Sequence, residues 1–467
     1  MRVRRPIFLS SYAISDLSLV DNLCRKVYST SDLASAGEIA SMHGVLFFVL
    51  KELIAMKDPL CQKFDLLTYL DHCEQNFVAA IETYEVLAVP AFENILALTM
   101  GMLMSQGEAK PHLYWKLVSA AVMHCQSLEY HLEATYQSIP SSKAESIRRL
   151  FWTVYAFDKS MSLVLGRASH MQDLRIDTKY PTMSQDLTLR AWDESFIMGI
   201  RLAEIQGRIF VGLYSTCSMI RDSSERAQRI SDLADAMEKW HLEFKQIDSE
   251  GINNPQAFYL TRGNGDIQFY STLTLLFHAS SAIGQDLQIG PHCFNAACNS
   301  LRAHLEVFPR YQKSQLLSDG DYFNWILLSS SFVPFIVTFL HAIAAKDMAN
   351  VTLPEQVVDT LENFRNVSQG SERLYQICVT FTQIAKKLVQ SQRSPIGGIY
   401  NQQQDSLLLV DSSHSTSLFD SETLQEIFDS DDMNGVNPSY AMDTLNDWLS
   451  GPPFPWDKLD VDIGKGQ

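Results

Sequence analysis

Residues 144–165 read AESIRRLFWTVYAFDKSMSLVL and contain neither glycine nor proline. Apolar side chains recur in this segment every three to four residues, which is the period of one face of an α-helix. The positions on that face are Ile147, Leu150, Phe151, Val154, Asp158, Met161 and Leu165. The segment therefore predicts a helix that packs against a core, with one carboxylate, Asp158, on the face that meets it.

Asp158 admits two interpretations, a catalytic acid or a structural clasp. A carboxylate removed from water is costly unless it is paired, and basic residues lie nearby in the sequence: Arg148, Arg149 and Arg167. No second carboxylate lies at a helical spacing beside Asp158, so the pattern disfavours a catalytic role. We expect a buried or half-buried ion pair that clasps this helix to the loop after it.

The helical period continues on both sides of this segment, up to about residue 392. Apolar residues recur at i, i+3, i+4 and i+7 between short polar or Pro/Gly breaks. The expected helices are 35–56, 66–87, 91–104, 113–136, 144–165, 189–215, 225–247, 267–283, 293–307, 322–345, 355–367 and 371–390. Strand patterns are few, so we predict an all-α fold: a large multi-helix body with a mostly disordered acidic C-terminal tail.

Local signals predict where some of the breaks fall. Gly166 follows residues 144–165, at a position where a left-handed residue commonly ends a helix. Ser142 and Glu145 have the spacing of a capping box at the start of the same helix. Residues 251–265 are rich in Gly, Asn and Pro and are expected to form a loop.

The net charge of −17 is concentrated at the C-terminus. Residues 401–467 contain 13 acidic and 2 basic side chains, a net of −11, so the rest of the chain carries −6. This change in composition divides the chain into a short N-terminal segment (1–34), a helical domain (35–392) and an acidic tail (393–467). An acidic balance also argues against a broad phosphate-binding face.

Isolated bulky apolar residues interrupt the polar and acidic tail. Such a segment cannot bury enough surface to offset its ordering entropy. Its apolar residues nevertheless lie at helical spacings among acids, a pattern suited to a groove on another protein. The candidate activation contacts are Leu424, Ile427, Phe428, Leu445, Trp448, Leu449, Phe454 and Trp456. Docking of these residues onto the chain's own helical body is the alternative interpretation.

The remaining motifs indicate no catalytic or metal site. The eight cysteines include no C-x2-C pair, so we expect reduced packing residues rather than a structural zinc site. No phosphate loop, G-x-S-x-G elbow or H-E-x-x-H pair occurs. We therefore expect no enzyme activity, no catalytic residue, no metal ligand and no cofactor.

Residues 322–345 contain no charged side chain and are long enough to span a bilayer. They also contain Asn324, Pro334 and His341, together with three consecutive serines at 329–331. Polar residues of this kind are expensive within lipid. We predict a core helix here and no membrane span.

The segment 148–181 resembles the signature of the fungal-specific transcription factor domain, also called the middle homology region of the zinc-cluster regulator family. That signature has paired arginines, Phe-Trp, Tyr and Asp-Arg/Lys on one helix, followed by Gly-Arg-Pro and a final pair of aspartates. The matching residues are Arg148, Arg149, Phe151, Trp152, Tyr155, Asp158, Lys159, Gly166, Arg167, Asp173 and Asp177. Ala168 replaces the usual proline and Arg175 an acidic residue, and the resemblance extends over roughly 35–392.

The resemblance implies a transcription regulator that dimerises and acts in the nucleus. Family members usually carry an N-terminal zinc cluster with six cysteines, but only Cys24 precedes Cys61 in this sequence. Zinc is therefore expected only if a missing N-terminal cluster exists, and DNA contact only indirectly or through such a module. The expected partners are a second copy of this chain or a related regulator, and the transcription machinery through the tail.

The sequence is compatible with two functions. The first is a pathway-specific activator of metabolic genes, a secondary-metabolite biosynthetic cluster being one candidate target. In it the helical domain regulates and dimerises while the tail activates. The second is a helical ligand-binding or sequestering co-regulator without direct DNA binding.

Overall fold

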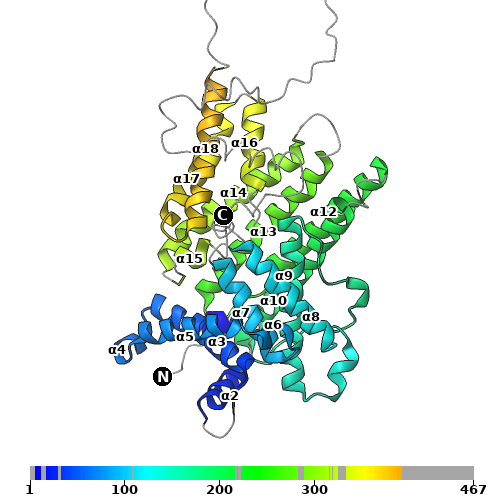
Figure 1. The fold of residues 1–467 in the computed structure, drawn as a ribbon. Helices are drawn as coiled ribbons and strands as arrows, with labels where there is room; N and C mark the ends of the chain where they lie inside the picture. The colour runs from blue at the N-terminus through cyan, green and yellow to red at the C-terminus, as the bar shows by residue number, and fades with distance from the viewer. Residues whose placement is uncertain are drawn as a thin grey trace, which may run out of the picture.

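The computed structural model describes residues 6–11, 17–29, 33–107, 110–215, 218, 222–281, 289–314, 316–317, 319–323, 333–345 and 347–391. Every regular element in those ranges is a helix, which confirms the all-α prediction. Figure 1 shows the blue N-terminal helices at one end of the molecule and the yellow and orange C-terminal helices at the other.

The first half of the chain builds one hydrophobic core. Its elements are α1 (Ile7–Ser11), α2 (Leu17–Tyr28), α3 (Ala36–Ala55), α4 (Leu60–Lys63), α5 (Leu66–Ile81), α6 (Tyr84–Ala88), α7 (Phe92–Gly107), α8 (Pro111–Ser127) and the 3-10 helix η1 (Glu133–Ser138). Helix α3 packs against α5 and α7, and α7 packs against α8. Phe77, Leu98 and Val118 are almost fully buried where these helices meet, because each helix turns its apolar face inward.

The second half builds a second core. Its elements are α10 (Leu187–Ile209), the π-helix η3 (Phe210–Tyr214), α12 (Ser223–Lys245), α13 (Pro255–Ser281), α14 (Pro291–Ser314), α15 (Asp319–Tyr322), α16 (Val333–Ala345), η5 (Met348–Asn350), α17 (Thr352–Leu361), η6 (Glu362–Phe364) and α18 (Gln369–Ser391). Helix α13 packs along α14, and α14 contacts α16 and α17. The rings of Tyr311, Tyr322 and Phe364 stack in its interior, with centroids 4.0 Å and 5.5 Å apart along the stack.

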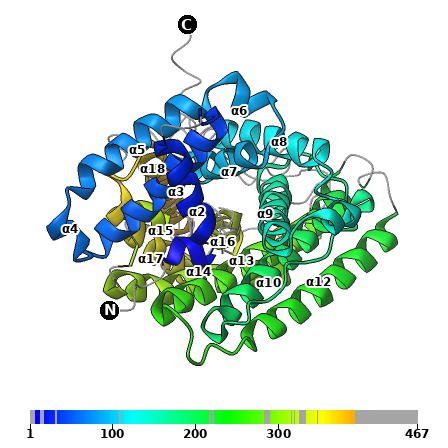
Figure 2. The ribbon, with the colours of Figure 1, turned by 90° about the horizontal axis from the view of Figure 1, so that it is seen from below.

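Helix α9 (Ser141–Leu165) lies where the two cores meet. Ile147, Phe151 and Val154 belong to the first core, whereas Leu163 and Val164 belong to the second. Figure 2 shows α9 between α8 and α10, both of which it contacts. A helix buried on several sides must hold its polar side chains within the protein, and this requirement shapes the site described below.

Most of the predicted helices are observed, and most of their ends are shifted by a few residues. The helix predicted over 113–136 ends earlier, at Ser127, and the one predicted over 267–283 begins earlier, at Pro255. The segment predicted as 35–56 is α3, and Ser35 caps it: the Ser35 Oγ accepts a hydrogen bond from the Glu38 backbone N–H, 3.2 Å away. The segment predicted as 66–87 divides into α5 and α6. Within 1–34, helices α1 and α2 pack against α3, so this segment forms part of the helical body.

The predicted loop at 251–265 is wrong for most of its length, because α13 begins at Pro255 and runs through Gly263 and Gly265. A Cβ atom at Gly263 would lie 2.3 Å from Val307 Cγ2 of α14. One at Gly265 would lie 2.2 Å from Phe244 Cε1 of α12. The glycines therefore permit close helix packing and do not mark a turn, and this gain offsets their low helix propensity.

The two ends of α9 differ in how they match the sequence signals. Gly166 adopts φ 65°, the left-handed conformation predicted for the residue that ends the helix. The predicted capping box is wrong: the helix begins at Ser141 after Pro140, and no side chain caps it. The Glu145 carboxylate instead accepts hydrogen bonds from the backbone N–H and hydroxyl of Thr182, at 3.0 and 2.9 Å.

The uncharged stretch 322–345 is described at residues 322–323 and as α16. Val333, Ile336 and Phe339 are buried there, in the second core. None of the helices that the structure describes has the length and hydropathy needed to cross a bilayer. The acidic tail and its eight candidate activation contacts lie outside the described residues.

Candidate functional site

Asp158 is fully buried, and its carboxylate binds the loop that follows α9. Its two oxygens accept hydrogen bonds from the Ser169 hydroxyl at 2.5 Å, the His170 backbone N–H at 2.9 Å and the Met171 backbone N–H at 3.0 Å. The His170 ring Nδ1 lies 3.0 Å away as well. The predicted clasp between helix and loop is therefore present.

The predicted arginine partners of Asp158 are wrong. Arg148 pairs with Glu133 at 3.2 Å, and Arg149 pairs with Asp193 at 2.8 Å. The guanidinium of Arg167 lies over the Trp115 ring, 5.9 Å from its centroid. Backbone N–H groups of a loop can satisfy a carboxylate as well as a cation does, and sequence spacing does not reveal them.

Lys159 and Tyr155 of the motif bind the part of the loop that follows the Asp158 contacts. The Lys159 ammonium is buried, donates to the Met171 carbonyl at 2.7 Å and pairs with the Asp173 carboxylate at 2.8 Å. The Tyr155 hydroxyl donates to the same Asp173 oxygen at 3.0 Å. Asp173 was identified by the motif alone, and the structure brings it to α9.

Earlier turns of α9 hold later parts of the loop. The Trp152 indole N–H donates to the Lys179 carbonyl at 2.8 Å, and the Arg149 guanidinium donates to the Thr182 carbonyl at 2.9 Å. The loop thus runs back along the helix and is fixed at successive turns. We call this set the signature ladder, defined by its helix residues: Arg149, Trp152, Tyr155, Asp158 and Lys159.

Two remaining motif residues fasten the loop to η1. The Arg148 guanidinium lies 4.2 Å from the centroid of the Tyr136 ring and beside the Glu133 carboxylate. The Asp177 carboxylate accepts from the Glu133 backbone N–H at 2.8 Å. Phe151 is buried in the first core and packs edge-on against Trp152, with centroids 5.3 Å apart.

The pKa of Asp158 is lowered from its ordinary value. Burial by itself raises this pKa, but the hydrogen bonds from His170, Ser169 and the backbone of Met171 favour the carboxylate and outweigh it. Asp158 is therefore ionised at neutral pH with its donors already in place. A group of this kind is a poor proton donor at neutral pH, and the ladder is suited to holding structure rather than to catalysis.

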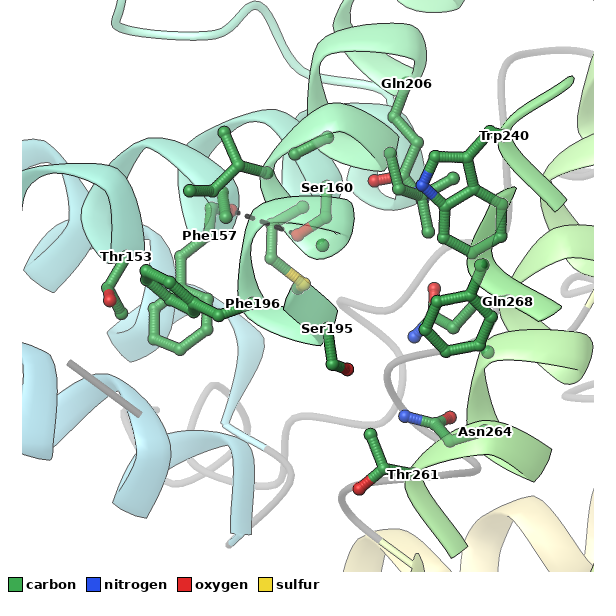
Figure 3. Close-up of a pocket in the computed structure, with 18 of the residues that line it drawn as sticks. Thr153, Phe157, Ser160, Ser195, Phe196, Gln206, Trp240, Thr261, Asn264 and Gln268 are labelled. Carbon is green, nitrogen blue, oxygen red and sulfur yellow. Dashed lines mark hydrogen bonds between the residues drawn. The ribbon is translucent and has the colours of Figure 1, made fainter. Parts of the chain in front are cut away.

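The opposite side of α9 borders a half-open cavity of about 250 Å³ that is lined mainly by α9, α10, α12 and α13. Figure 3 shows Phe157 and Ser160 of α9, Ser195 and Phe196 of α10, and Asn264 of α13 around it. None of the described residues that line it carries a charge. Sequence reasoning missed this site, because its α13 wall lies in the stretch predicted as a loop.

The described cysteines are free, and most are buried. Burial raises the pKa of Cys73 to about 11 and of Cys293 to about 12, so both are thiols at neutral pH. No three His, Cys, Asp or Glu side chains are grouped to hold a metal ion in the part of the chain that the structure describes.

The ladder lies within the part of the chain that a protein-family model matches. Residues 58–242 match the family model described as the fungal-specific transcription factor domain. The matched region includes all the ladder helix residues and ends within α12, so α13 to α18 lie beyond it.

The chain is similar to several fungal regulators. An uncharacterised transcriptional regulatory protein of Schizosaccharomyces pombe is 22% identical over 68% of this chain and 52% of its own length. The fusaridione A cluster transcription factor of Fusarium heterosporum is 28% identical over 30% of this chain and 27% of its own. An ABC-transporter-regulating transcription factor of Aspergillus fumigatus is 24% identical over 62% and 35%.

The matched part of this chain thus spans about half the length of the first of these relatives, and less of the others. These relatives are named as transcriptional regulators and not as enzymes. No solved structure matches the chain.

Proposed function

We propose that this chain is the regulatory and activating part of a fungal transcription regulator that controls a metabolic gene set in the nucleus. The match of residues 58–242 to the fungal-specific transcription factor domain carries the proposal. A relative named for the fusaridione A cluster supports a biosynthetic gene cluster as the target class. The helical body would regulate and dimerise, with itself or a related regulator, and the acidic tail would recruit the transcription machinery.

The tail's role rests on its sequence pattern. Residues 401–467 carry a net charge of −11, and Leu445, Trp448 and Leu449 lie at helical spacings between acids. An amphipathic segment of this kind binds by placing its apolar face in a groove, and the acids steer it to a basic rim. Self-docking onto the body would use the same apolar residues, so the test must separate the two.

The test is a fusion of residues 401–467 to a foreign DNA-binding domain with a reporter gene. We expect strong activation, lost when Leu445, Trp448 and Leu449 are changed together to Ala. Thr444→Ala with Asn446→Ala is the matched control, because it alters the same short segment away from its apolar face. Background reporter output from the unchanged tail would contradict the activating role.

DNA contact would come from a six-cysteine zinc cluster encoded ahead of residue 1 or from a partner subunit. The two sources are distinguished by mapping the 5′ end of the transcript and by electrophoretic mobility assays with the purified chain. A transcript that encodes the six cysteines supports the first source. DNA binding only in the presence of a second regulator supports the other.

A second candidate is a ligand-binding or sequestering co-regulator without an activating role. The observation that favours it is the uncharged cavity beside α9. This function predicts that the tail fusion is silent while the helical body still binds a full-length family member. Co-precipitation of residues 1–392 with such a regulator, together with the reporter assay, decides between the two candidates.

A further inference from the structure

We infer that the cavity between α9, α10, α12 and α13 binds an uncharged, mostly apolar small molecule of one or two rings with a hydrogen-bond donor. The inference concerns this chain's own cavity and does not depend on the role of the tail. The charge, the size, the polar groups and the walls of the cavity each support it.

The absence of charge on the lining restricts the ligand class. None of the described lining residues is Asp, Glu, Lys, Arg or His. An ionised ligand would lose its hydration here without gaining a counter-charge, which is costly. A carboxylate, a phosphate ester or an ammonium compound is therefore disfavoured, whereas a neutral phenol, lactone or amide is not.

The cavity's volume restricts the size. A dry apolar cavity of about 150 Å³ accommodates benzene in another protein, and this one has about 250 Å³. A compound of one or two rings is therefore the best fit. Ligand pockets for larger, drug-sized compounds run up to about 1,000 Å³, so a bulky ligand would require the helices to move.

Polar side chains line the site on several helices, and three of them share one face of α13. Thr261, Asn264 and Gln268 are spaced i, i+3 and i+7 along α13, which places them on one face of that helix. Figure 3 shows all three on the α13 side, with Ser195 of α10 opposite. A ligand can therefore orient its polar end towards these three side chains and its ring towards Phe157 of α9 and Phe196 of α10.

Asn264 supplies the sharpest element of recognition. Its side-chain oxygen is buried and has no hydrogen-bond partner among the described residues. A buried amide left unpaired is destabilising. A hydroxyl or N–H group on the ligand would satisfy this oxygen, and this is why the inferred ligand carries a donor.

The aromatic walls are fixed by contacts outside the cavity. The Trp240 indole N–H donates to the Met198 carbonyl at 2.7 Å, and the Trp192 indole N–H donates to the Asn253 carbonyl at 2.9 Å. The Gln206 amide donates to the Thr272 hydroxyl at 3.1 Å. With its indole N–H groups already bonded, the site is preorganised for a flat apolar ring, which lowers the entropy cost of binding.

The site can be tested with three probes of one ring system: 2-naphthol, naphthalene and 2-naphthoate. The full chain is titrated at pH 7, and binding is followed by isothermal calorimetry and by the change in total tryptophan fluorescence, to which Trp192 and Trp240 of the cavity wall contribute. We expect 2-naphthol to bind saturably, about tenfold or more tighter than the anionic 2-naphthoate. Naphthalene, which lacks the donor, should bind more weakly than 2-naphthol.

Two variants locate the binding at this cavity. Gly199 lines it, and a Cβ atom there would meet nothing within 4 Å, so Gly199→Phe should fill the mouth and abolish binding of 2-naphthol. Gly290→Phe is the matched control, because Gly290 does not line the cavity and a Cβ atom there would also meet nothing within 4 Å; this variant should bind as the unchanged chain does. Asn264→Leu should reduce the affinity for 2-naphthol to that for naphthalene.

Several outcomes would overturn the inference. They are no saturable binding of 2-naphthol up to its solubility, equal affinity for the neutral and anionic probes, or unchanged affinity in folded Gly199→Phe. Should that variant fail to fold, the comparison of probes on the unchanged chain and the Asn264→Leu result still decide. A silent tail fusion leaves this inference intact, because binding is measured on the purified chain.

Discussion

The two sides of α9 differ in how their polar and charged groups are satisfied. On one side, the signature ladder surrounds Asp158 with donors from Ser169, His170 and Met171 until its carboxylate is fully satisfied. On the other side, Phe157 and Ser160 face a cavity with no charged lining among the described residues. The ladder combines charge, burial and many hydrogen bonds, whereas the cavity has space, aromatic walls and an unpaired amide oxygen.

This difference teaches where function is to be sought in such a domain. The ladder residues belong to the motif that resembles the fungal-specific transcription factor domain, yet their polar atoms are already engaged with the chain's own loop. A satisfied network is rigid and leaves no group free for a ligand. The cavity belongs to no recognisable motif, and its open space and unpaired amide are what a ligand could use.

The largest expected effect comes from breaking the ladder at Asp158. The Asp158→Asn side chain keeps the size but presents an NH₂ group to backbone N–H donors, so one oxygen's hydrogen bonds are lost within a buried site. We expect a loss of about 3 kcal/mol in the free energy of unfolding, measured by urea denaturation. Ser169→Ala, which removes one donor, is the control and should cost about 1 kcal/mol.

The same residue predicts a pH dependence. Because the folded-state pKa of Asp158 is lowered, its contribution to stability is fully present above the ordinary Asp pKa of about 4. That contribution is lost as the pH falls through the lower folded value. The stability difference between the unchanged chain and Asp158→Asn should therefore shrink on acidification below about pH 4. A constant difference across this range would contradict the assignment.

A smaller loss is expected where the cavity wall is packed. Gly265→Ala places a methyl group 2.2 Å from Phe244 Cε1, so the helices must separate or the ring must shift. We expect a loss of about 2 kcal/mol by thermal or chemical denaturation. Gly199→Ala, on the same cavity but in open space, should instead be neutral or stabilising by up to about 1 kcal/mol. Equal effects at both positions would refute the close-packing explanation.

Removing one cation from the ladder should cost less than removing its carboxylate. Lys159→Met keeps the buried aliphatic stem but loses the hydrogen bond to the Met171 carbonyl and the pair with Asp173. Asp173 is half exposed and so keeps water as a partner, and the Met171 backbone N–H stays bound to Asp158. We expect a loss of about 1.5 kcal/mol, with chemical denaturation as the measurement. A loss as large as that of Asp158→Asn would mean that the ladder acts as one cooperative network.

The smallest expected effect is at the cavity's polar wall. Asn264→Leu removes a buried amide oxygen that has no partner among the described residues, so it forfeits no known hydrogen bond from that atom. We expect the free energy of unfolding of this variant to lie within about 1 kcal/mol of that of the unchanged chain, and any change to be an increase. Circular dichroism melting curves measure this directly. A strong destabilisation would show that Asn264 serves the fold instead of the cavity.

Local patterns were enough to predict most of the helices. Of the two signals at the ends of α9, they predicted the glycine that ends the helix and not the way it begins. The recurrence of apolar residues every three to four positions located α3 and α9 within a few residues. Gly166 marked the end of α9 because the left-handed conformation that ends a helix there favours glycine. The same reasoning failed at 251–265. Gly263 and Gly265 look like turn residues until the neighbouring Val307 and Phe244 are placed against them.

By itself the sequence determined the helical class, the likeness of residues 148–181 to a known domain and the acidic character of the tail, because each depends on residue type and spacing along the chain. Only the tertiary structure decided which groups satisfy Asp158, since its partners are backbone atoms of a loop that folds back along α9. The tertiary structure also determined that a cavity forms, because its walls come from four helices, α9, α10, α12 and α13. A space between helices is a property of their packing and leaves no periodic trace in any one of them.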